Sequence, residues 1–439
     1  MQATTRSVAL TEWDRRGPKG LPVSLDGPEA RTVGEELTRS GRLVVRELAR
    51  GLEISSTSWV GRVRLGTLEI TIAPKVGGQT LLRLLRYAYG LRDLSLLERA
   101  DYAMVDSLLV DLLVAQLHAE VREIVARGLT RRYLPVRETL QSPRGRIDML
   151  CLARRGGRVD RGLPCVHHPR LEDNVLNQTL LAGLRLAARA AVDMELGAAC
   201  RRLASVLEIQ ISTVELTTSL LLTARRELNR LVHAYEPALT LIELLYQASG
   251  LSLEDQERAM PLSGFLFDMN RFFQTLLSRF LRENLTAWEV RDEYRISDMM
   301  RYVPGKNPLR RRSPRPRPDF AVLKQGTVRA LLDAKYRDLW AHSLPREMLY
   351  QLAIYALSQR QGAMATILYP TDAHRPREQQ VELSDPIGGY GRGYVVLRPV
   401  QLDVLDSLVR DESPKGRRRR AEHARWLAFG AGKVHGVQL

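Results

Sequence analysis

Three charged side chains, Asp319, Asp333 and Lys335, flank a predicted β-hairpin. The first strand follows Pro318 and Asp319, a turn contains Gly326, and the second strand ends at Asp333. Folding the chain back at Gly326 brings both carboxylates to the same end of the strand pair. Lys335 lies two residues after Asp333, and the strand period of two puts their side chains on one face. The sequence therefore predicts a cluster of two carboxylates and one ammonium.

Such a cluster suits metal-assisted hydrolysis of a phosphodiester. Mg²⁺ is commonly held by one or two carboxylates together with waters and substrate phosphate. A bound metal lowers the pKa of its water and stabilises charge on a phosphoryl oxygen, and a nearby Lys can orient the nucleophile. We expect Asp319 and Asp333 to bind Mg²⁺, or Mn²⁺ in its place, and Lys335 to assist the attacking water. The same residues could also form a surface ion pair.

The order Pro-Asp, hairpin, Asp-x-Lys resembles the PD-(D/E)XK nuclease superfamily. The next segment, 344–357, has the pattern of a helix opened by Pro345, with Gln351 and Tyr355 four residues apart on one face. This pair resembles the Gln-x-x-x-Tyr motif of RecB-like nucleases. The resemblance implies that both residues lie beside the active site, where they support it or contact DNA. The alternative interpretation, without this resemblance, is a solvated Gln351 and a Tyr355 in the hydrophobic core.

The composition is strongly basic, with 66 Lys+Arg against 50 Asp+Glu in 439 residues and a formal net charge of +16. This excess favours a polyanionic partner, and nucleic acid is the simplest candidate, although an Arg-rich genome would give the same balance. Segment 301–317 is basic and interrupted by prolines, which predicts a loop without regular structure. The loop is either a solvated insertion or a clamp on DNA phosphates. Its candidate DNA contacts are Arg310, Arg311, Arg312, Arg315 and Arg317.

Several other classes of site are disfavoured. The three cysteines form no CxxC pair, which fits a reducing compartment rather than a disulfide framework. Cys165 lies close to His167 and His168, but no second Cys/His pair at zinc-finger spacing follows. The chain has no apolar signal core or run of eighteen apolar residues, so we expect a cytoplasmic protein without a membrane partner. It also lacks a P-loop motif, so we expect no nucleotide bound by this chain.

Two regions are predicted. Residues 1–250 form an α+β N-terminal region of β-hairpins and long helices, β-rich at 40–76 and mainly helical at 80–250. The region carries no enzyme motif, which argues that it binds a partner. Residues 251–439 form an α/β restriction-endonuclease-like PD-(D/E)XK domain. We expect this second domain to begin with a helix over 265–284 and to have a strand over 288–296 before the hairpin.

A closer resemblance involves a Gly-containing hairpin that ends in the alternating strand from Leu68 to Lys75 and is followed by a helix. This stretch is similar to the McrC family, the nuclease subunits of McrBC type IV restriction systems. Segments 133–138, 144–148 and 172–177 are also similar, in the family's order, and the likeness runs from about Trp59 to Tyr355. It implies cleavage of DNA with modified cytosine, together with an McrB-like AAA+ GTPase hexamer. The N-terminal half would dock on that hexamer and stimulate its GTP hydrolysis.

One position departs from the family pattern. Gln274 stands where the family often has a Glu that assists metal binding, and a neutral amide holds a cation more weakly than a carboxylate. Two alternatives therefore stay open. One is a non-catalytic assembly or activator subunit that keeps the fold as a DNA-binding scaffold, and the other is a stand-alone RecB-like repair nuclease. The DNA mark, the stoichiometry and the cleavage pattern are not encoded in these motifs.

Overall fold

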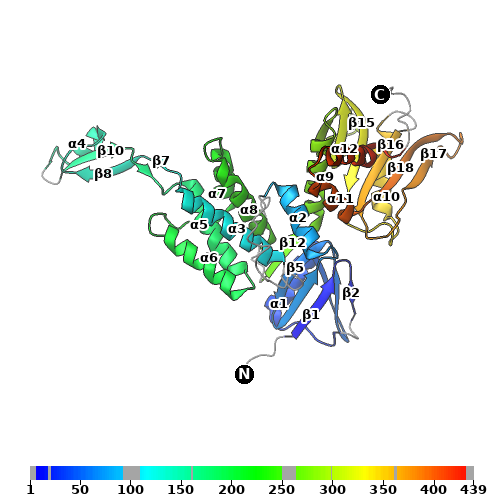
Figure 1. Cartoon of the computed structure of the whole chain (residues 1–439), viewed down its shortest axis with the longest axis horizontal. Coiled ribbons are helices and arrows are strands. Elements are labelled where there is room, and N and C mark those ends of the chain that lie inside the picture. Colours follow the sequence, from blue (N-terminus) through cyan, green and yellow to red (C-terminus); the bar gives the residue numbers. More distant parts are fainter. Residues whose placement is uncertain are drawn as a thin grey trace. The chain divides into compact units, whose positions relative to one another are not determined.

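The computed structural model describes residues 6–17, 21–91, 109–159, 162–249, 264–297, 299–359 and 363–431. Its backbone forms two compact units (Figure 1). The first unit comprises Met1–Val60, Leu65–Asp93 and Asp268–Leu439, and the second comprises Gly61–Arg64 and Leu94–Phe267. The mixture of helices and several sheets confirms the predicted α/β character. The predicted domain boundary at residue 250 lies outside the described residues and stays a prediction.

The N-terminal part of the first unit combines two helices with short strands. Helix α1 (Gly27–Arg39) carries Pro28 in its first turn, and α2 (Gly78–Tyr89) ends at Gly90, whose φ of 67° suits a residue without Cβ. Strands β1 and β6 pair in parallel, and a separate antiparallel sheet has the order β2-β4-β3. The strands are β1 (Arg6–Thr11), β2 (Arg15–Arg16), β3 (Leu43–Leu48), β4 (Gly51–Ser56), β5 (Trp59–Leu65) and β6 (Leu68–Ala73). Residues Gly61–Arg64 of β5 are counted in the second unit.

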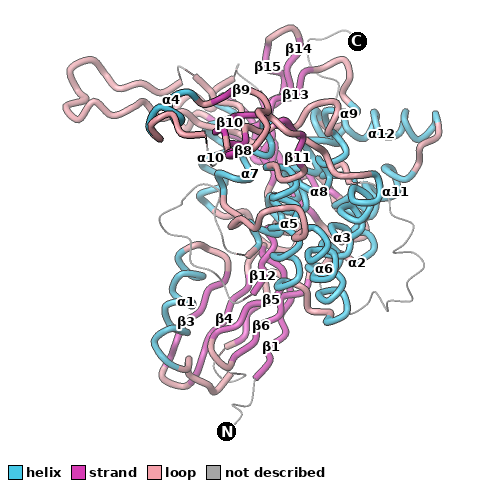
Figure 2. The backbone as a smooth tube through the Cα atoms, turned by 90° about the vertical axis from the view of Figure 1, so that its left-hand side faces the viewer, coloured by secondary structure: helices cyan, strands magenta, loops and turns pink. Residues whose placement is uncertain are grey.

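The C-terminal part of the first unit contains the largest sheet in the described part of the chain, with six strands in the order β13-β14-β15-β16-β18-β17. Strands β13, β14 and β15 are antiparallel neighbours, which Figure 2 shows side by side, and β15, β16 and β18 are parallel. The strands are β13 (Glu289–Asp292), β14 (Phe320–Lys324), β15 (Thr327–Ala334), β16 (Ala363–Pro370), β17 (Gln379–Ser384) and β18 (Gly391–Val400). The helices are α9 (Met269–Asn284), α10 (Arg346–Leu357), α11 (Leu402–Arg410) and α12 (Pro414–Phe429).

Side chains alternate between the two faces along each strand of this sheet, and α10 packs on one of these faces. Leu323, Leu331 and Ile367 share one hydrophobic core with Leu352 and Tyr355 of α10. These strand residues are odd-numbered, so the period of two also directs Asp333 toward the face that α10 covers. Helices α9 and α12 contact β15 as well. The predicted hairpin therefore lies at the centre of the packed structure.

The N-terminal part packs directly on the C-terminal part within the first unit. Arg83 of α2 donates two hydrogen bonds to the Asp406 carboxylate of α11, at 2.8 and 2.7 Å. Asp406 is only 4% exposed. The hydroxyl of Tyr87 donates to Glu283 of α9 at 2.6 Å, and Arg279 donates to the Tyr87 carbonyl at 2.6 Å. Residues of the N-terminal part thus complete the core of this unit.

Replacing Arg83 by Ala is expected to lower the free energy of unfolding by about 2 kcal/mol, because the buried Asp406 carboxylate loses both hydrogen bonds from Arg83 and keeps only Arg410, at 3.7 Å, as a cation. Urea unfolding monitored by circular dichroism measures the change. The control is Arg31→Ala, which breaks an exposed pair with Glu47 and should cost much less. Equal losses in the two variants would contradict the role assigned to the buried pair.

The second unit consists mainly of helices. Helix α5 contacts α3, α6 and α8. Between α3 and α5 the chain forms small antiparallel sheets of order β8-β10-β9 and β11-β7. The helices are α3 (Leu109–Arg127), α4 (Met149–Arg154), α5 (Val175–Ala190), α6 (Met194–Leu207), α7 (Thr218–Glu227), the 3₁₀ turn η1 (His233–Tyr235) and α8 (Glu236–Ala248). The strands are β7 (Arg132–Tyr133), β8 (Val136–Leu140), β9 (Arg146–Ile147), β10 (Leu163–His167) and β11 (Arg170–Leu171).

The predicted helix over 265–284 is wrong at its beginning. Gly264–Asp268 is a strand, β12, and α9 starts at Met269. A short continuous apolar run fits a buried strand as well as a helix, so periodicity alone cannot separate them. Asp268 accepts hydrogen bonds from the amides of Asn270 and Arg271 and caps α9. The predicted strand over 288–296 is shorter, with β13 limited to Glu289–Asp292. In the described ranges, no helix combines the length and apolarity needed to cross a bilayer.

Candidate active site

The hairpin of β14 and β15 brings the three predicted side chains together. Gln325 and Gly326 form its turn with φ values of 51° and 75°, as a tight two-residue hairpin turn requires. Phe320 pairs with Leu332, so the next position on each strand places Asp319 opposite Asp333. The Lys335 Nζ lies 2.9 Å from Asp333 Oδ2 and 3.7 Å from Asp319 Oδ2.

Burial and mutual repulsion set the charge state of this cluster. The Asp333 side chain is 2% exposed, and those of Asp319 and Lys335 are 20% and 24% exposed. Desolvation and the Asp333 charge raise the pKa of Asp319 to about 6, against the opposing effects of Lys335, the Ala334 amide and Gln274. Burial lowers the pKa of Lys335, but the two carboxylates outweigh it and the net pKa is raised. Lys335 is therefore an ammonium at neutral pH.

A buried oxygen of this cluster lacks a partner. Asp333 Oδ1 is inaccessible to solvent and has no hydrogen-bond donor. An unsatisfied carboxylate oxygen is costly, and a divalent cation would satisfy it. Asp319 is held in place beside it, because its Oδ2 accepts the Ala334 amide at 2.8 Å. The two carboxylates therefore fit a Mg²⁺ ion that completes its coordination with water or phosphate oxygens.

A site with more protein ligands is not found elsewhere in the described residues. No group of three or more His, Cys, Asp or Glu side chains within the ranges given above could hold a metal ion. His167 forms a hydrogen bond with Glu138, while Cys165 is buried in β10. The Asp319 and Asp333 pair remains the candidate metal site.

Gln351 and Tyr355 also lie at the cluster. The amide of Gln351 donates to the hydroxyl of Tyr355 at 2.6 Å along one face of α10. Tyr355 is 2% exposed. Burial raises the pKa of Tyr355, and the charges of Asp333, Asp319 and Lys335 act on its hydroxyl. All five residues predicted for the catalytic site are thus gathered around one end of β15.

An open cavity of about 740 Å³ runs along α9 and reaches Asp319. From α9 it is lined by Arg271, Gln274, Ser278 and Arg282, which occupy one helical face. Gln274 donates a hydrogen bond that lowers the pKa of Asp319. The residue that departs from the family pattern therefore lies at the site and favours the ionised form of a predicted metal ligand.

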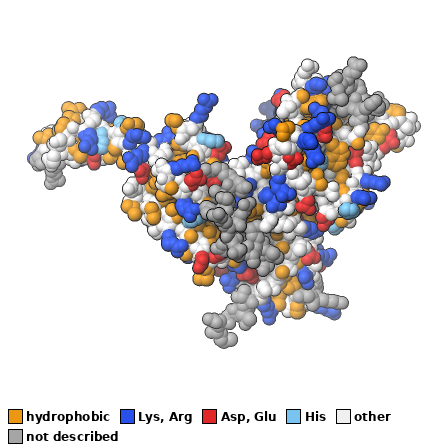
Figure 3. Space-filling model, viewed as in Figure 1, with side chains coloured by type: hydrophobic (Ala, Val, Ile, Leu, Met, Phe, Trp, Pro, Cys, Tyr) orange, Lys and Arg blue, Asp and Glu red, His pale blue; other side chains and the backbone are white. Residues whose placement is uncertain are grey.

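The basic loop over 301–317 lacks helix and strand, as predicted. Arg312, Arg315 and Arg317 line an open cavity of about 600 Å³, together with Ser313 and Arg295. Arg310 and Arg311 are exposed but lie outside that lining. The Ile296 amide donates to the Pro316 carbonyl at 2.9 Å, which holds the end of the loop close to Asp319. Elsewhere, basic side chains are interspersed with acidic ones over the face in Figure 3.

Residues distant in sequence also reach the site. Asn270 Oδ1 accepts the Tyr336 amide at 2.9 Å, and Trp13 Nε1 donates to the Tyr336 carbonyl at 3.1 Å. The Tyr336 hydroxyl donates to Glu12 at 3.3 Å. No local sequence pattern indicates these residues, because their contacts span 66, 323 and 324 positions.

Glu12 is a buried carboxyl with an unusual charge state. Its exposure is 2%. Desolvation raises its pKa to about 7, against the lowering effects of the Lys75 amide, the Tyr336 hydroxyl and the Lys75 charge. The folded protein therefore holds a proton on Glu12 that the unfolded chain loses near its ordinary pKa of 4.5. The stability that this proton confers is complete below about pH 4.5 and is lost as pH rises through about 7.

The Glu12→Gln variant should escape this loss. Between pH 5 and pH 8, the wild type should lose about 3 kcal/mol more of its free energy of unfolding than the variant does. The reason is that the amide keeps the hydrogen bonds without acquiring a charge. Urea unfolding at the two pH values measures this difference. For comparison, Glu47→Gln should lose stability at pH 8, since the hydrogen bond from Arg31 lowers the pKa of Glu47. The same pH dependence in wild type and Glu12→Gln would contradict the assignment.

Comparison with known proteins assigns the chain to a family. The family model of the McrBC 5-methylcytosine restriction system component matches residues 54–370. That range includes the segment from about Trp59 to Tyr355 on which the sequence resemblance rests. A search of the curated proteins gives no match.

A solved structure shows the same fold. One similar chain belongs to the refined half-complex from the tetradecameric assembly of Thermococcus gammatolerans McrB AAA+ hexamers with bound McrC. It has a TM-score of 0.61 and 20% identity, covering 95% of this chain and 99% of that chain. A chain of the cryo-EM structure of the Thermococcus gammatolerans McrBC complex has a TM-score of 0.45 and 20% identity, covering 64% and 88%. The chain belongs to the family of McrBC 5-methylcytosine restriction system components.

Proposed function

We propose that this chain is the DNA-cleaving subunit of an McrBC-like restriction complex and that residues 268–439 contain a PD-(D/E)XK nuclease domain. In this proposal the chain is a Mg²⁺-dependent endonuclease that hydrolyses phosphodiesters of DNA carrying modified cytosine. It acts with an AAA+ GTPase hexamer, whose GTP hydrolysis it stimulates, and binds no nucleotide itself. Family membership and the similar fold of a chain from an assembly of McrB with bound McrC support the partner.

The observation that carries the proposal is the unsatisfied Oδ1 of Asp333 beside Asp319 and Lys335. A purely structural ion pair would leave neither a buried carboxylate oxygen without a donor nor a second carboxylate with a raised pKa. Both features fit a site that is completed by a divalent cation. They also argue against the scaffold alternative, in which nothing would offset the cost of the unpaired buried oxygen.

Each side chain has a distinct role in the proposed reaction. Asp319 and Asp333 would hold Mg²⁺, which when bound lowers the pKa of a water and stabilises charge on the phosphoryl oxygens. Lys335 keeps its proton, so it acts as a hydrogen-bond donor that orients the water and neutralises developing charge, not as a base. Gln351 fixes the hydroxyl of Tyr355, and this pair supports the site or contacts the DNA.

The arginine-lined cavity supplies a phosphate contact in this proposal. A guanidinium matches phosphate geometry, and the loop ends at Arg317, two residues before Asp319. Arg312, Arg315 and Arg317 would bind the DNA backbone near the cut, joined by Arg295. Arg310 and Arg311 remain predicted contacts on the exposed part of the loop.

A double variant, Arg312→Gln with Arg315→Gln, is expected to weaken DNA binding and to reduce the slope of log K against log salt by about 2, since each phosphate contact contributes about 0.9. Fluorescence anisotropy with a labelled duplex over a range of NaCl concentrations measures both effects. Arg201→Gln with Arg202→Gln, on an exposed turn of α6, removes the same charge and should leave the slope unchanged. Equal changes in the two double variants would mean that only net charge matters.

The function itself is tested by cleavage of methylated and unmethylated plasmid DNA in Mg²⁺, with and without the AAA+ GTPase and GTP. The proposal predicts cutting of methylated plasmid only when the chain, the GTPase and GTP are all present. Cutting by this chain alone would instead support the RecB-like repair nuclease. Absence of cutting under every condition would support the non-catalytic assembly subunit.

A further inference from the structure

Tyr336, the residue after Lys335, is held by side chains on every polar group it has. Its amide donates to Asn270 at 2.9 Å, its carbonyl accepts Trp13 at 3.1 Å, and its hydroxyl donates to Glu12 at 3.3 Å. The side chain is 3% exposed, and its ring packs edge-on against Phe273 at 5.9 Å. The backbone that follows Lys335 therefore has one allowed position.

This arrangement begins where the sheet ladder ends. The Lys335 amide still donates to the Leu368 carbonyl at 3.0 Å, so β16 fixes the near side of Lys335. The N–H of Tyr336 instead donates to the Asn270 side chain, and its C=O accepts from the Trp13 indole. Lys335 thus lies between a strand contact on one side and side-chain contacts on the other. Loss of the contact with β16, or of the contacts with Asn270 and Trp13, would let the backbone at Lys335 move and would displace the Lys335 ammonium.

The three residues that hold Tyr336, namely Glu12, Trp13 and Asn270, come from separate elements of the first unit. Glu12 and Trp13 follow β1, whereas Asn270 lies in the first turn of α9. The Nδ2 of Asn270 also donates to Ser58 Oγ at 2.7 Å, and the Met269 amide donates to the Ser58 carbonyl at 3.0 Å. The N-terminal part therefore orients Asn270 as well as contacting Tyr336 itself.

Trp13 is held in an uncommon backbone conformation. Its φ is 57°, in the left-handed region that bulky residues rarely adopt. Such a conformation persists only where surrounding contacts enforce it. The Trp13 indole donates to Tyr336, and the Arg337 guanidinium lies over its ring at 5.2 Å. These contacts account for the strained conformation and place it at the proposed active site.

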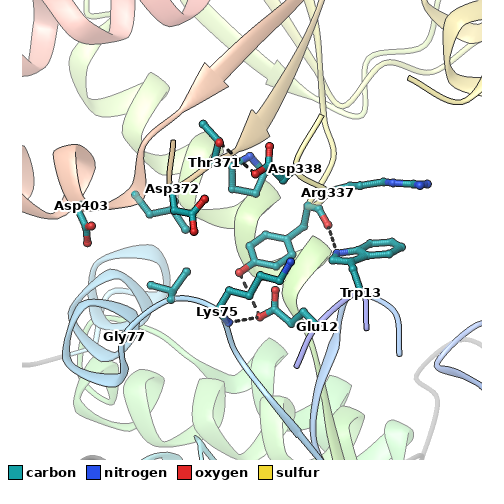
Figure 4. A pocket seen from close by; sticks show the side chains of 13 residues that line it. Glu12, Trp13, Lys75, Gly77, Arg337, Asp338, Thr371, Asp372 and Asp403 are labelled. Atoms are coloured by element: carbon teal, nitrogen blue, oxygen red, sulfur yellow. Dashed lines mark hydrogen bonds between the residues drawn. The ribbon is translucent and has the colours of Figure 1, made fainter. Parts of the chain in front are cut away.

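A cavity of about 130 Å³ adjoins these anchors. In Figure 4, Glu12, Trp13 and Lys75 lie on one side of it, and Asp338 and Thr371 lie on the other. The Asp338 carboxylate accepts the Thr371 hydroxyl at 3.1 Å and the Trp340 amide at 2.9 Å, which fixes the chain just beyond Arg337. The cavity wall is thus made of rigidly bonded groups on both sides of Tyr336.

We infer that Asn270, Trp13 and Glu12 are positioning residues for the nuclease reaction, acting through Tyr336 to hold Lys335 at Asp319 and Asp333. The inference rests on the proposed function and extends it, because it makes the N-terminal strands part of the active-site support. Separating the N-terminal part from the C-terminal part would then impair the chemical step itself. None of the three residues touches the DNA or the metal in this account.

The test compares variants in the complete complex with the AAA+ GTPase, using single-turnover cleavage of methylated plasmid in Mg²⁺. Asn270→Ala and Trp13→Phe remove single hydrogen bonds to Tyr336. Each should reduce the cleavage rate by about 10-fold to 100-fold, since small displacements of a catalytic group have effects of this size. The DNA concentration that gives half-saturation and the stimulation of GTP hydrolysis should stay at wild-type values, because binding and docking do not depend on Lys335.

Asn270→Asp provides the rescue. A carboxylate keeps the acceptor for the Tyr336 amide and can accept the Ser58 hydroxyl, so its cleavage rate should return to within about threefold of wild type. Trp59→Phe is the matched control, because this indole stacks with Arg42 instead of contacting Tyr336, and its rate should not change. Melting temperatures exclude general destabilisation as the cause of a lower rate.

The outcomes separate this inference from the proposed function. Cleavage by wild type with full activity in Asn270→Ala and Trp13→Phe would refute the positioning role alone. Failure of Asn270→Asp to recover activity would do the same. If the wild-type complex does not cleave, the proposed function fails first and the positioning role fails with it.

Discussion

The Asp333→Asn variant is expected to bind Mn²⁺ at least about 100-fold more weakly than wild type, because it loses one of the two carboxylates that can hold the ion. Asp333 is the member of the cluster with an unsatisfied buried oxygen, so its charge is the one that a cation compensates. The same substitution removes a repulsion that raises the pKa of Asp319, so that pKa should fall toward its ordinary value. Without metal, the variant should be at least as stable as wild type at pH 8, as expected where function conflicts with stability.

Isothermal titration calorimetry with Mn²⁺ at pH 8 measures the affinity, and thermal unfolding in EDTA measures the stability. Asp403→Asn, an exposed carboxylate in the first turn of α11, is the matched control and should bind Mn²⁺ like wild type. Wild-type affinity in Asp333→Asn would exclude this residue as a ligand. Because metal and protons compete for Asp319, wild-type affinity should rise with pH through about 6.

The Lys335→Gln variant is expected to lower the single-turnover cleavage rate by about 100-fold to 1,000-fold, the usual range for removing one donor that stabilises a transition state. Lys335 lowers the pKa of Asp319, so its removal should raise that pKa and move the pH at which metal binds upward. Lys335→Arg keeps the charge but changes its geometry. It should therefore preserve the pH of metal binding while remaining slow in cleavage.

Cleavage rates and Mn²⁺ affinities of the two variants between pH 5.5 and 9 separate these effects. The charge-neutral Gln variant should show the shifted pH profile, and the Arg variant should show the wild-type profile with a lower plateau. A wild-type rate in Lys335→Gln at any pH would mean that the ammonium does not act in the chemical step. Identical profiles in the two variants would mean that its charge does not influence Asp319.

The hairpin and its cluster could be predicted because they depend on local patterns. Alternation fixes the strands, Gly326 fixes the turn, and the resulting register brings Asp319 opposite Asp333. The helical period likewise puts Gln351 beside Tyr355, which the hydrogen bond between them bears out. In each case, the residues that must meet are close in sequence.

What the sequence did not predict depends on distant contacts or on ambiguous runs. The contact of Asn270 with Tyr336 requires α9 and the hairpin to pack against each other first, and no local pattern encodes it. The run from Phe265 to Phe267 suits strand or helix equally, and only the capping residue Asp268 marks where α9 begins. In α1, Pro28 is a start signal, but the helix buries only Ala30, Gly34 and Leu37, so its apolar period is weak.

The role of Gln274 also follows only from the three-dimensional structure. In the sequence it is a neutral residue at a position where a carboxylate is expected. In the structure its amide donates to Asp319 and favours ionisation of that group. A donor at this point compensates for burial of Asp319, so the substitution is compatible with a working metal site.

The most direct test of the whole account is single-turnover cleavage of methylated plasmid by the complex with the AAA+ GTPase and GTP, comparing wild type with Asp333→Asn in Mg²⁺. The account predicts Mg²⁺-dependent cutting by wild type that EDTA abolishes, and a rate at least about 1,000-fold lower in Asp333→Asn despite normal stimulation of GTP hydrolysis. Equal cutting by the two proteins would contradict the assigned active site.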